Sequence, residues 1–218
     1  RKEVHQIIKD RRVTINGEIT TKKDIHIDID VDTVAVDGQT VNTTQLYYVK
    51  FHKPKGYVTA VEDSTHPVVM DLLPPEYLKM GVVPVGRLDK DTEGLLLLTN
   101  DGVWGHSIIN GHKHVPKVYY VEFEGELSEE GIQRIKEGIV LGDKTQCKPA
   151  LIKLLSDQSA TITIEEGKYH QVKRMIGAAG GTVSYLKRLT IGHVDLNGIE
   201  EVGSVMDLTI DDVEGFKK

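Results

Sequence analysis

The chain has 218 residues, 39% of them apolar, and a formal net charge of −6. A chain of this length can bury one ordinary core and a small appendage without help from disulfides or metals. Its single cysteine, Cys147, excludes an intramolecular disulfide, and no apolar run approaches the roughly 20 residues that span a bilayer. The chain also starts with charged residues and no apolar segment. We therefore expect a cytoplasmic protein without a membrane partner.

The first 44 residues predict a small unit. Apolar residues recur at helical spacing over residues 1–10, which indicates a helix with a basic opposite side. Short strands are expected at Val13–Ile15 and Val34–Val36, because each runs into a strong turn signal, Asn-Gly or Asp-Gly. A unit of this size is below the length that usually folds securely alone.

Residues 45–218 predict a second, larger domain. Strands are expected at residues 47–51, 82–85, 95–99, 118–123, 151–154 and 161–165. One helix is expected to begin after Ser128 as N-cap and to end by Gly138, and another to run from about His170 to the Gly180-Gly181 pair. This pattern predicts an α+β domain built on a large mixed, mostly antiparallel sheet with flanking helices.

Basic residues are concentrated in two places, although the net charge is negative. Acidic residues cluster elsewhere, at 24–37 and at 195–214. This distribution fits a polarised molecule that presents one face to RNA, and it fits equally well two solvated charged faces. The two basic groups are Arg1, Lys2, Lys9, Arg11, Arg12, Lys22 and Lys23, and then Lys168, Lys173, Arg174, Lys187 and Arg188.

The most informative segment is residues 86–94, Gly-Arg-Leu-Asp-Lys-Asp-Thr-Glu-Gly, between two expected buried strands. A polar loop supported on both sides by strands is a common place for catalytic groups, which makes Arg87 and Asp89 candidates. The alternative is that Asp89 or Asp91 caps a turn and that Arg87 pairs with a surface acid.

The run 86–102 resembles the signature of the RsuA branch of the pseudouridine synthases, in which the Asp after Arg-Leu is indispensable. Other motifs of that family follow the expected order: Lys-Pro-Lys-Gly-Tyr at 53–57, Lys-Val-Tyr-Tyr-Val at 117–121 and Glu-Gly-Lys-Tyr-His-Gln-Val-Lys-Arg-Met at 166–175. The resemblance covers about residue 47 to the C-terminus. Residues 1–17 are similar to an S4 RNA-binding domain that lacks its first helix.

The resemblance implies a pseudouridine synthase catalytic domain at 45–218, an S4-like RNA-binding domain at 1–44, and isomerisation of a uridine in ribosomal RNA. The reaction breaks a carbon-nitrogen bond and rejoins the uracil through C5, so no cofactor is implied. Asp89 would be the essential carboxylate, Tyr119 the ring that stacks on the everted base, and Arg87 a residue that extrudes the base or holds phosphate. Whether Asp89 attacks the sugar, attacks the ring or removes a sugar proton stays open.

A closed pocket would disfavour the charged form of Asp89, so a cation is needed beside it. The expected second helix can supply one. Its apolar stripe is Val172, Met175, Ile176 and Ala179, and its opposite side carries His170, Lys173 and Arg174. By the family resemblance, Lys173 is the partner of Asp89, and Arg174 binds phosphate. A plain amphipathic helix with a solvated basic side is the alternative.

The expected RNA ligands lie in both predicted domains. They are Arg1, Lys2, Lys9, Arg11, Arg12, Lys53, Lys55, Lys117, His170 and Arg174. We expect no metal site, because His106, His112 and His114 lack a cysteine partner and a recognisable ligand spacing. We expect the chain to be a monomer.

Details of the motifs favour the small-subunit 16S ribosomal RNA, at a uridine of the 516 type or in an assembly intermediate, over large-subunit 23S RNA. A non-catalytic RNA-binding protein would explain the basic groups but not the 86–102 loop. A two-carboxylate hydrolase using Asp89 and Asp91 would need both acids.

Overall fold

The protein forms two compact units, Arg1–Leu46 and Tyr47–Lys218, in a computed structural model that describes residues 2–28, 31–41, 45–110 and 115–217. The expected domain boundary, after Thr44, lies two residues before this division, next to residues outside the described ranges. Each unit is described by itself below.

The first unit contains one helix and four short strands in its described residues. Helix α1 (Lys2–Lys9) precedes an antiparallel sheet with the order β2-β1-β3-β4. The predicted helix and the predicted strands β1 (Val13–Ile15) and β3 (Val34–Val36) are confirmed; β2 (Glu18–Ile19) and β4 (Gln39–Thr40) complete the two hairpins. Val13 is the only buried apolar residue among those described in this unit, so its core is small.

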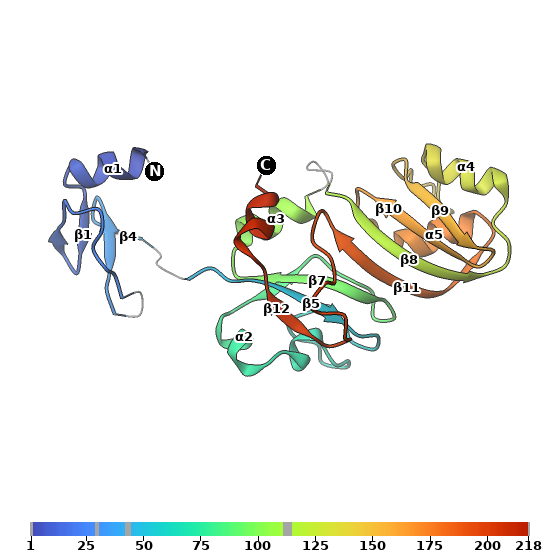
Figure 1. The fold of residues 1–218 in the computed structure, drawn as a ribbon, viewed down its shortest axis with the longest axis horizontal. Helices are drawn as coiled ribbons and strands as arrows, with labels where there is room; N and C mark the ends of the chain where they lie inside the picture. Colours follow the sequence, from blue (N-terminus) through green and yellow to red (C-terminus); the bar gives the residue numbers. More distant parts are fainter. Residues whose placement is uncertain (1, 29–30, 42–44, 111–114, 218) are drawn as a thin grey trace. The chain divides into compact units, whose positions relative to one another are not determined.

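The second unit is built on an eight-stranded sheet, counted over the described residues, with the strand order β12-β5-β7-β11-β8-β10-β9 and β6 paired to β7 (Figure 1). Among the strands of the described part of this unit, β7 and β11 are the one pair that runs parallel. The confirmed fold class is therefore mixed and mostly antiparallel. The strands are β5 (Tyr48–Lys53), β6 (Val83–Val85), β7 (Glu93–Thr99), β8 (Lys117–Glu124), β9 (Leu151–Ser156), β10 (Ser159–Ile164), β11 (Thr182–Ile191) and β12 (Val205–Asp207).

Helices cover this sheet in separate groups. Helices α4 (Glu129–Glu137) and α5 (Gln171–Ala178) pack on the half formed by β8 to β11, whereas α3 (Gly102–Ile109) and α6 (Ile210–Gly215) lie next to each other near β7 (Figure 1). The 3-10 helix η1 (Val69–Leu72) and α2 (Pro75–Lys79) cover β5 and β7 from the other side. Helix α4 has the predicted ends, because the Ser128 hydroxyl accepts from the Gly131 amide and Gly138 takes a φ of 101°.

Several elements of this unit were not predicted: the strands β11 and β12, the 3-10 helix η1, and the helices α2, α3 and α6. Strand β11 is the longest in the described chain, yet its charged Lys187 and Arg188 made it look like a solvated basic segment. Its β-branched and aromatic residues were the signal for a strand. Helix α3 begins at the end of the 86–102 run, because Asp101 caps it by accepting from the amides of Val103 and Trp104.

Candidate active site

The segment 86–92 connects β6 to β7 and is fixed by the strands on both sides. Gly86 starts it with a φ of 72°, a conformation that favours glycine. Leu88 is buried, its amide and carbonyl both bond the Thr59 hydroxyl, and the Thr92 amide donates to the Asp89 carbonyl at 3.0 Å. Asp89 is half-buried between these anchors. Its backbone therefore has little freedom, as a catalytic carboxylate requires.

Lys53, at the end of β5, also fixes this loop. Its side chain is fully buried and donates to the carbonyls of Pro54, Asp89 and Thr92 at 3.0, 3.0 and 2.7 Å. Burial lowers the pKa of Lys53 to about 8. The prediction that Lys53 binds RNA is wrong, because none of its surface is open to a ligand; the lysine supports the loop that carries Asp89.

Asp89 shares a cation with a second carboxylate. The Lys173 ammonium lies 2.9 Å from Asp89 Oδ2 and 2.5 Å from Asp91 Oδ1. Burial lowers the pKa of Lys173, but the hydrogen bonds and charges of Asp91 and Asp89 outweigh this and raise it. Burial likewise raises the pKa of Asp91, and Lys173 more than reverses the effect. Lys173 therefore stays charged beside Asp89 over the physiological pH range.

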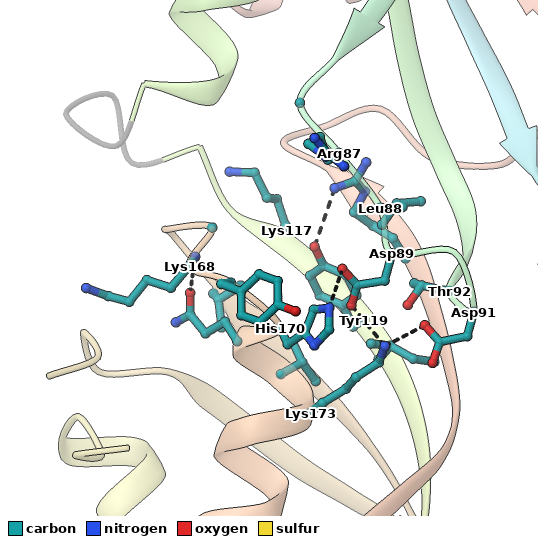
Figure 2. Close-up of a pocket in the computed structure, with 18 of the residues that line it drawn as sticks. Arg87, Leu88, Asp89, Asp91, Thr92, Lys117, Tyr119, Lys168, His170 and Lys173 are labelled. Carbon is teal, nitrogen blue, oxygen red and sulfur yellow. Dashed lines mark hydrogen bonds and ion pairs between the residues drawn. The ribbon is translucent and has the colours of Figure 1, made fainter. Parts of the chain in front are cut away.

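Helix α5 brings Lys173 to the loop because its other side is buried. Val172, Met175 and Ile176 are at most 4% exposed and pack in the same core as β8 and β10. His170 caps the start of the helix with a φ of 47°, uncommon for a non-glycine residue, and its ring nitrogen lies 3.4 Å from Asp89 Oδ1. Figure 2 shows His170 and Lys173 reaching Asp89 from the same helix end.

Tyr119 on β8 faces the cavity beside Asp89 (Figure 2) and is 8% exposed, whereas its neighbour Tyr120 points to the other face and donates to Glu122. The Tyr119 hydroxyl accepts from Arg188 of β11 at 3.4 Å. Arg188 itself is 4% exposed and lines the same cavity. The Tyr119 ring, whose hydroxyl bonds the Arg188 guanidinium, thus forms part of the cavity wall.

A cavity of about 1180 Å³ connects these side chains. This volume is slightly above the usual range for ligand pockets and leaves room for a nucleotide. Its lining includes Arg87, Asp89, Lys117, Tyr119, Lys168, His170, Lys173 and Arg188. The cavity therefore combines one half-buried carboxylate with a ring of cations, which suits a polyanionic substrate.

The other predicted RNA ligands of this unit differ in their exposure and in the bonds that their side chains already form. Arg87 is exposed at the rim, and Lys55 is exposed with its ammonium 4.2 Å from the centre of the Tyr185 ring. Lys117 donates to the Val115 carbonyl at 2.9 Å, and burial lowers its pKa to about 8. Arg174 is engaged by an ion pair with Asp143 at 2.5 Å, which a phosphate would have to replace.

In the first unit, Lys9, Arg11 and Arg12 are exposed, and Arg12 forms an ion pair with Asp37 at 2.5 Å. Lys2 belongs to α1, and Arg1 lies outside the described residues. His112 and His114 lie outside them as well. Among the described residues, no group of three or more His, Cys, Asp or Glu side chains could hold a metal ion, and no helix is long and apolar enough to cross a membrane.

Comparison with known proteins identifies the family of this chain. The family model described as RNA pseudouridylate synthase matches residues 47–178, which contain the loop, Tyr119 and helix α5. The chain belongs to the RNA pseudouridine synthase family. It is 41% identical over 213 residues to the uncharacterized RNA pseudouridine synthase YtzG of Bacillus subtilis, with 96% of this chain and 89% of that protein covered.

Two further relatives cover both units of this pseudouridine synthase. The ribosomal small subunit pseudouridine synthase A of Pasteurella multocida is 34% identical, with 100% of this chain and 94% of that protein covered. A crystal structure of a pseudouridylate synthase superposes with a TM-score of 0.73 at 34% identity and covers 99% of this chain and 93% of that one. The chain is thus an RNA pseudouridine synthase with the fold of its family.

Two features of the site were missed by reasoning from the sequence. His170 was expected to face RNA, but its ring also lies against Asp89. Arg188 was counted only as part of a basic group, because a single arginine in an unrecognised strand gives no sign of burial. The structure shows its role through the register of β11, in which Arg188 lies opposite Tyr119.

Proposed function

We propose that this enzyme isomerises one uridine of small-subunit ribosomal RNA, at a site of the 516 type, with Asp89 as the essential carboxylate. The observation that carries the proposal is the Asp89 carboxylate at 2.9 Å from Lys173 in a cavity large enough for a nucleotide. The choice of small-subunit RNA rests on the name of the Pasteurella relative, which aligns with all of this chain.

The geometry suggests how each side chain takes part. The target uridine leaves its stack, at a cost of a few kcal/mol, and its base lies against the Tyr119 ring. Lys173 lies 2.9 Å from the Asp89 carboxylate, and its positive charge offsets the loss of water around that carboxylate when the nucleotide enters the cavity. The carbon-nitrogen bond then breaks, the uracil turns, and its C5 joins the same sugar carbon. No atom is gained or lost, so the residues of the chain suffice.

Three routes fit this arrangement: attack of Asp89 on the sugar carbon, attack on the uracil ring, or removal of a sugar proton. All three require the charged form of Asp89 within reach of the nucleotide. Arg87, exposed at the rim, is placed to hold adjoining phosphate or to help evert the base.

The first unit is proposed to act as an S4-like RNA-binding module. Lys9 and Arg11 are exposed, and neither forms an ion pair with the described residues of this unit. Replacing both with glutamate should weaken RNA binding and flatten its salt dependence by about two charges, because each phosphate contact releases a counterion. Turnover at saturating RNA should change little. An unchanged dissociation constant at matched salt would exclude this role.

The test of substrate and reaction is a map of pseudouridines in ribosomal RNA. RNA from cells that lack the protein is tagged chemically and read by mass spectrometry, and the same cells receive back either the wild-type protein or Asp89→Asn. The proposal predicts that one small-subunit position loses its pseudouridine and that only the wild type restores it. Loss from large-subunit RNA, or restoration by Asp89→Asn, contradicts it.

A further inference from the structure

Arg188 is a buried cation whose hydrogen bonds are incomplete. Its side chain is 4% exposed; Nε donates to the Leu95 carbonyl at 2.7 Å and Nη1 to the Tyr119 hydroxyl at 3.4 Å. The Nη2 atom is buried and has no partner. Over the described residues, Arg188 forms no ion pair with a carboxylate, although it lines the cavity that holds Asp89.

A buried guanidinium with an unpaired donor destabilises the folded protein unless a ligand enters the cavity. A buried guanidinium without a counter-ion has lost its hydration, and one neutral carbonyl and one phenol replace only part of it. Lys53 and Lys117 add to the cost, because the charge of Arg188 contributes to the low pKa of each of them. The wall next to Tyr119 therefore has a surplus of positive charge and a free donor.

We propose that Arg188 is a catalytic residue that donates Nη2–H to a carbonyl oxygen of the target uracil and stabilises the negative charge that develops there. This inference rests on the proposed function, since it concerns the base that the enzyme isomerises. It adds a residue that the family motifs used above did not single out.

The position of Arg188 favours the base over the phosphate. Its guanidinium carbon lies 6.0 Å from the centre of the Tyr119 ring, and its Nη1 lies at the hydroxyl edge of that ring. A uracil stacked on the Tyr119 ring carries its carbonyl oxygens on its edge, where the guanidinium at the edge of the Tyr119 ring can approach one of them. A phosphate would have to give up its water to reach a side chain that is 4% exposed, whereas Arg87 is exposed at the rim.

The charge arises on every route that the site allows. If Asp89 displaces uracil from the sugar carbon, or removes a sugar proton so that uracil leaves, the electron pair of the broken bond stays on the uracil nitrogen. That charge spreads onto O2 and O4. If Asp89 adds to the ring, the electron pair moves to O4 as an enolate. The charge is cancelled when C5 forms its bond to the sugar carbon and Asp89 is released as the carboxylate. The C5 proton then leaves and N1 takes up a proton, so the product is neutral and no atom is lost overall. A fixed donor at such an oxygen lowers the barrier.

The test exchanges single oxygen atoms of the substrate for sulfur, which accepts hydrogen bonds poorly. Small-subunit RNA carrying uridine, 2-thiouridine or 4-thiouridine at the mapped position is converted by the wild type, Arg188→Met and Arg188→Lys under single-turnover conditions. For the wild type, sulfur at the oxygen that faces Arg188 should slow the reaction by about 10- to 100-fold. In Arg188→Met the rate on uridine should fall by about 10²- to 10³-fold, and the sulfur effect should vanish.

A merely structural role for Arg188 gives different results. If it only positions the Tyr119 ring, Tyr119→Phe and Arg188→Met lose similar activity, and both keep the sensitivity of the wild type to sulfur. If Arg188→Met keeps the sensitivity to sulfur, the proposal is overturned. It is also overturned if the wild type is insensitive to sulfur at both positions, and this second result does not depend on the folding of any variant. Failure of the proposed substrate is distinct, because the unmodified RNA is then not converted.

Discussion

Replacing Lys53 with methionine tests how the catalytic loop is held in place. Methionine has a similar length but no donor, so the carbonyls of Pro54, Asp89 and Thr92 lose their shared partner. Each buried carbonyl left without a hydrogen bond costs about 1–3 kcal/mol. The loop should therefore loosen where it carries Asp89.

One opposing effect reduces the loss. Burial lowers the pKa of Lys53 from 10.5 to about 8, which corresponds to about 3 kcal/mol that removal of the charge returns. The Asp89 carbonyl keeps its hydrogen bond from the Thr92 amide. The loss of this donor at the carbonyls of Pro54 and Thr92 therefore has to outweigh the gain. We expect Lys53→Met to lower the free energy of unfolding of residues 47–218 by about 1–3 kcal/mol.

The difference should depend on pH with a defined sign. A lysine whose pKa is lower in the folded protein destabilises the fold while it is charged, and this cost disappears as the pH rises from about 8 to 10.5. The wild type should therefore gain stability relative to Lys53→Met across that window, by up to about 3 kcal/mol. Below pH 8 the difference should be constant.

Urea unfolding followed by circular dichroism at several pH values measures both quantities. Lys55→Met is the matched control, because Lys55 is exposed two residues away and should cost less than about 1 kcal/mol. If Lys53→Met unfolds within 0.5 kcal/mol of the control, on the order of ordinary surface substitutions, the buried cation does not hold the loop.

The remaining predictions concern the cavity wall and the strands behind it. Burial lowers the pKa of Lys117 to about 8, so RNA turnover should fall as the pH rises through 8. Lys117→Arg should move this fall to higher pH. Identical pH profiles of the wild type and this variant would contradict the role of the Lys117 cation. Gly94 has a φ of 113°, and an added Cβ would lie 2.2 Å from the Arg188 carbonyl oxygen. Gly94→Ala should therefore lower the free energy of unfolding by at least about 3 kcal/mol. The control is Gly102→Ala, where the space is open, which should change the free energy of unfolding by less than about 1 kcal/mol. Equal unfolding midpoints for the two alanine variants would refute the close approach of β7 and β11.

The strands around the loop and the helix that carries Lys173 could be predicted because their patterns are regular. Val172, Met175 and Ile176 repeat at helical spacing, and all are buried as that spacing requires. The side of the helix left for Lys173 followed from the same periodicity. The structure then places its ammonium on Asp89.

The buried cations could not be predicted in this way. Lys53 and Arg188 lie in strands, where a charged residue usually faces solvent, and both are buried because backbone carbonyls accept their hydrogen bonds. Those carbonyls belong to segments about 40 and 90 positions away in the chain, so no local pattern reports them. Partners of this kind become visible only when the strands are assembled.

We propose that one carboxylate, Asp89, drives the isomerisation. The direct measurement is single-turnover conversion of uridine in small-subunit RNA by Asp89→Asn and by Asp91→Asn, with RNA binding measured in parallel. We predict that Asp89→Asn lowers the rate by about 10³-fold or more while RNA binding persists, and that Asp91→Asn, which loses only a second contact to Lys173, has a mild effect. Turnover retained by Asp89→Asn, or an equal loss in both variants, would contradict the account.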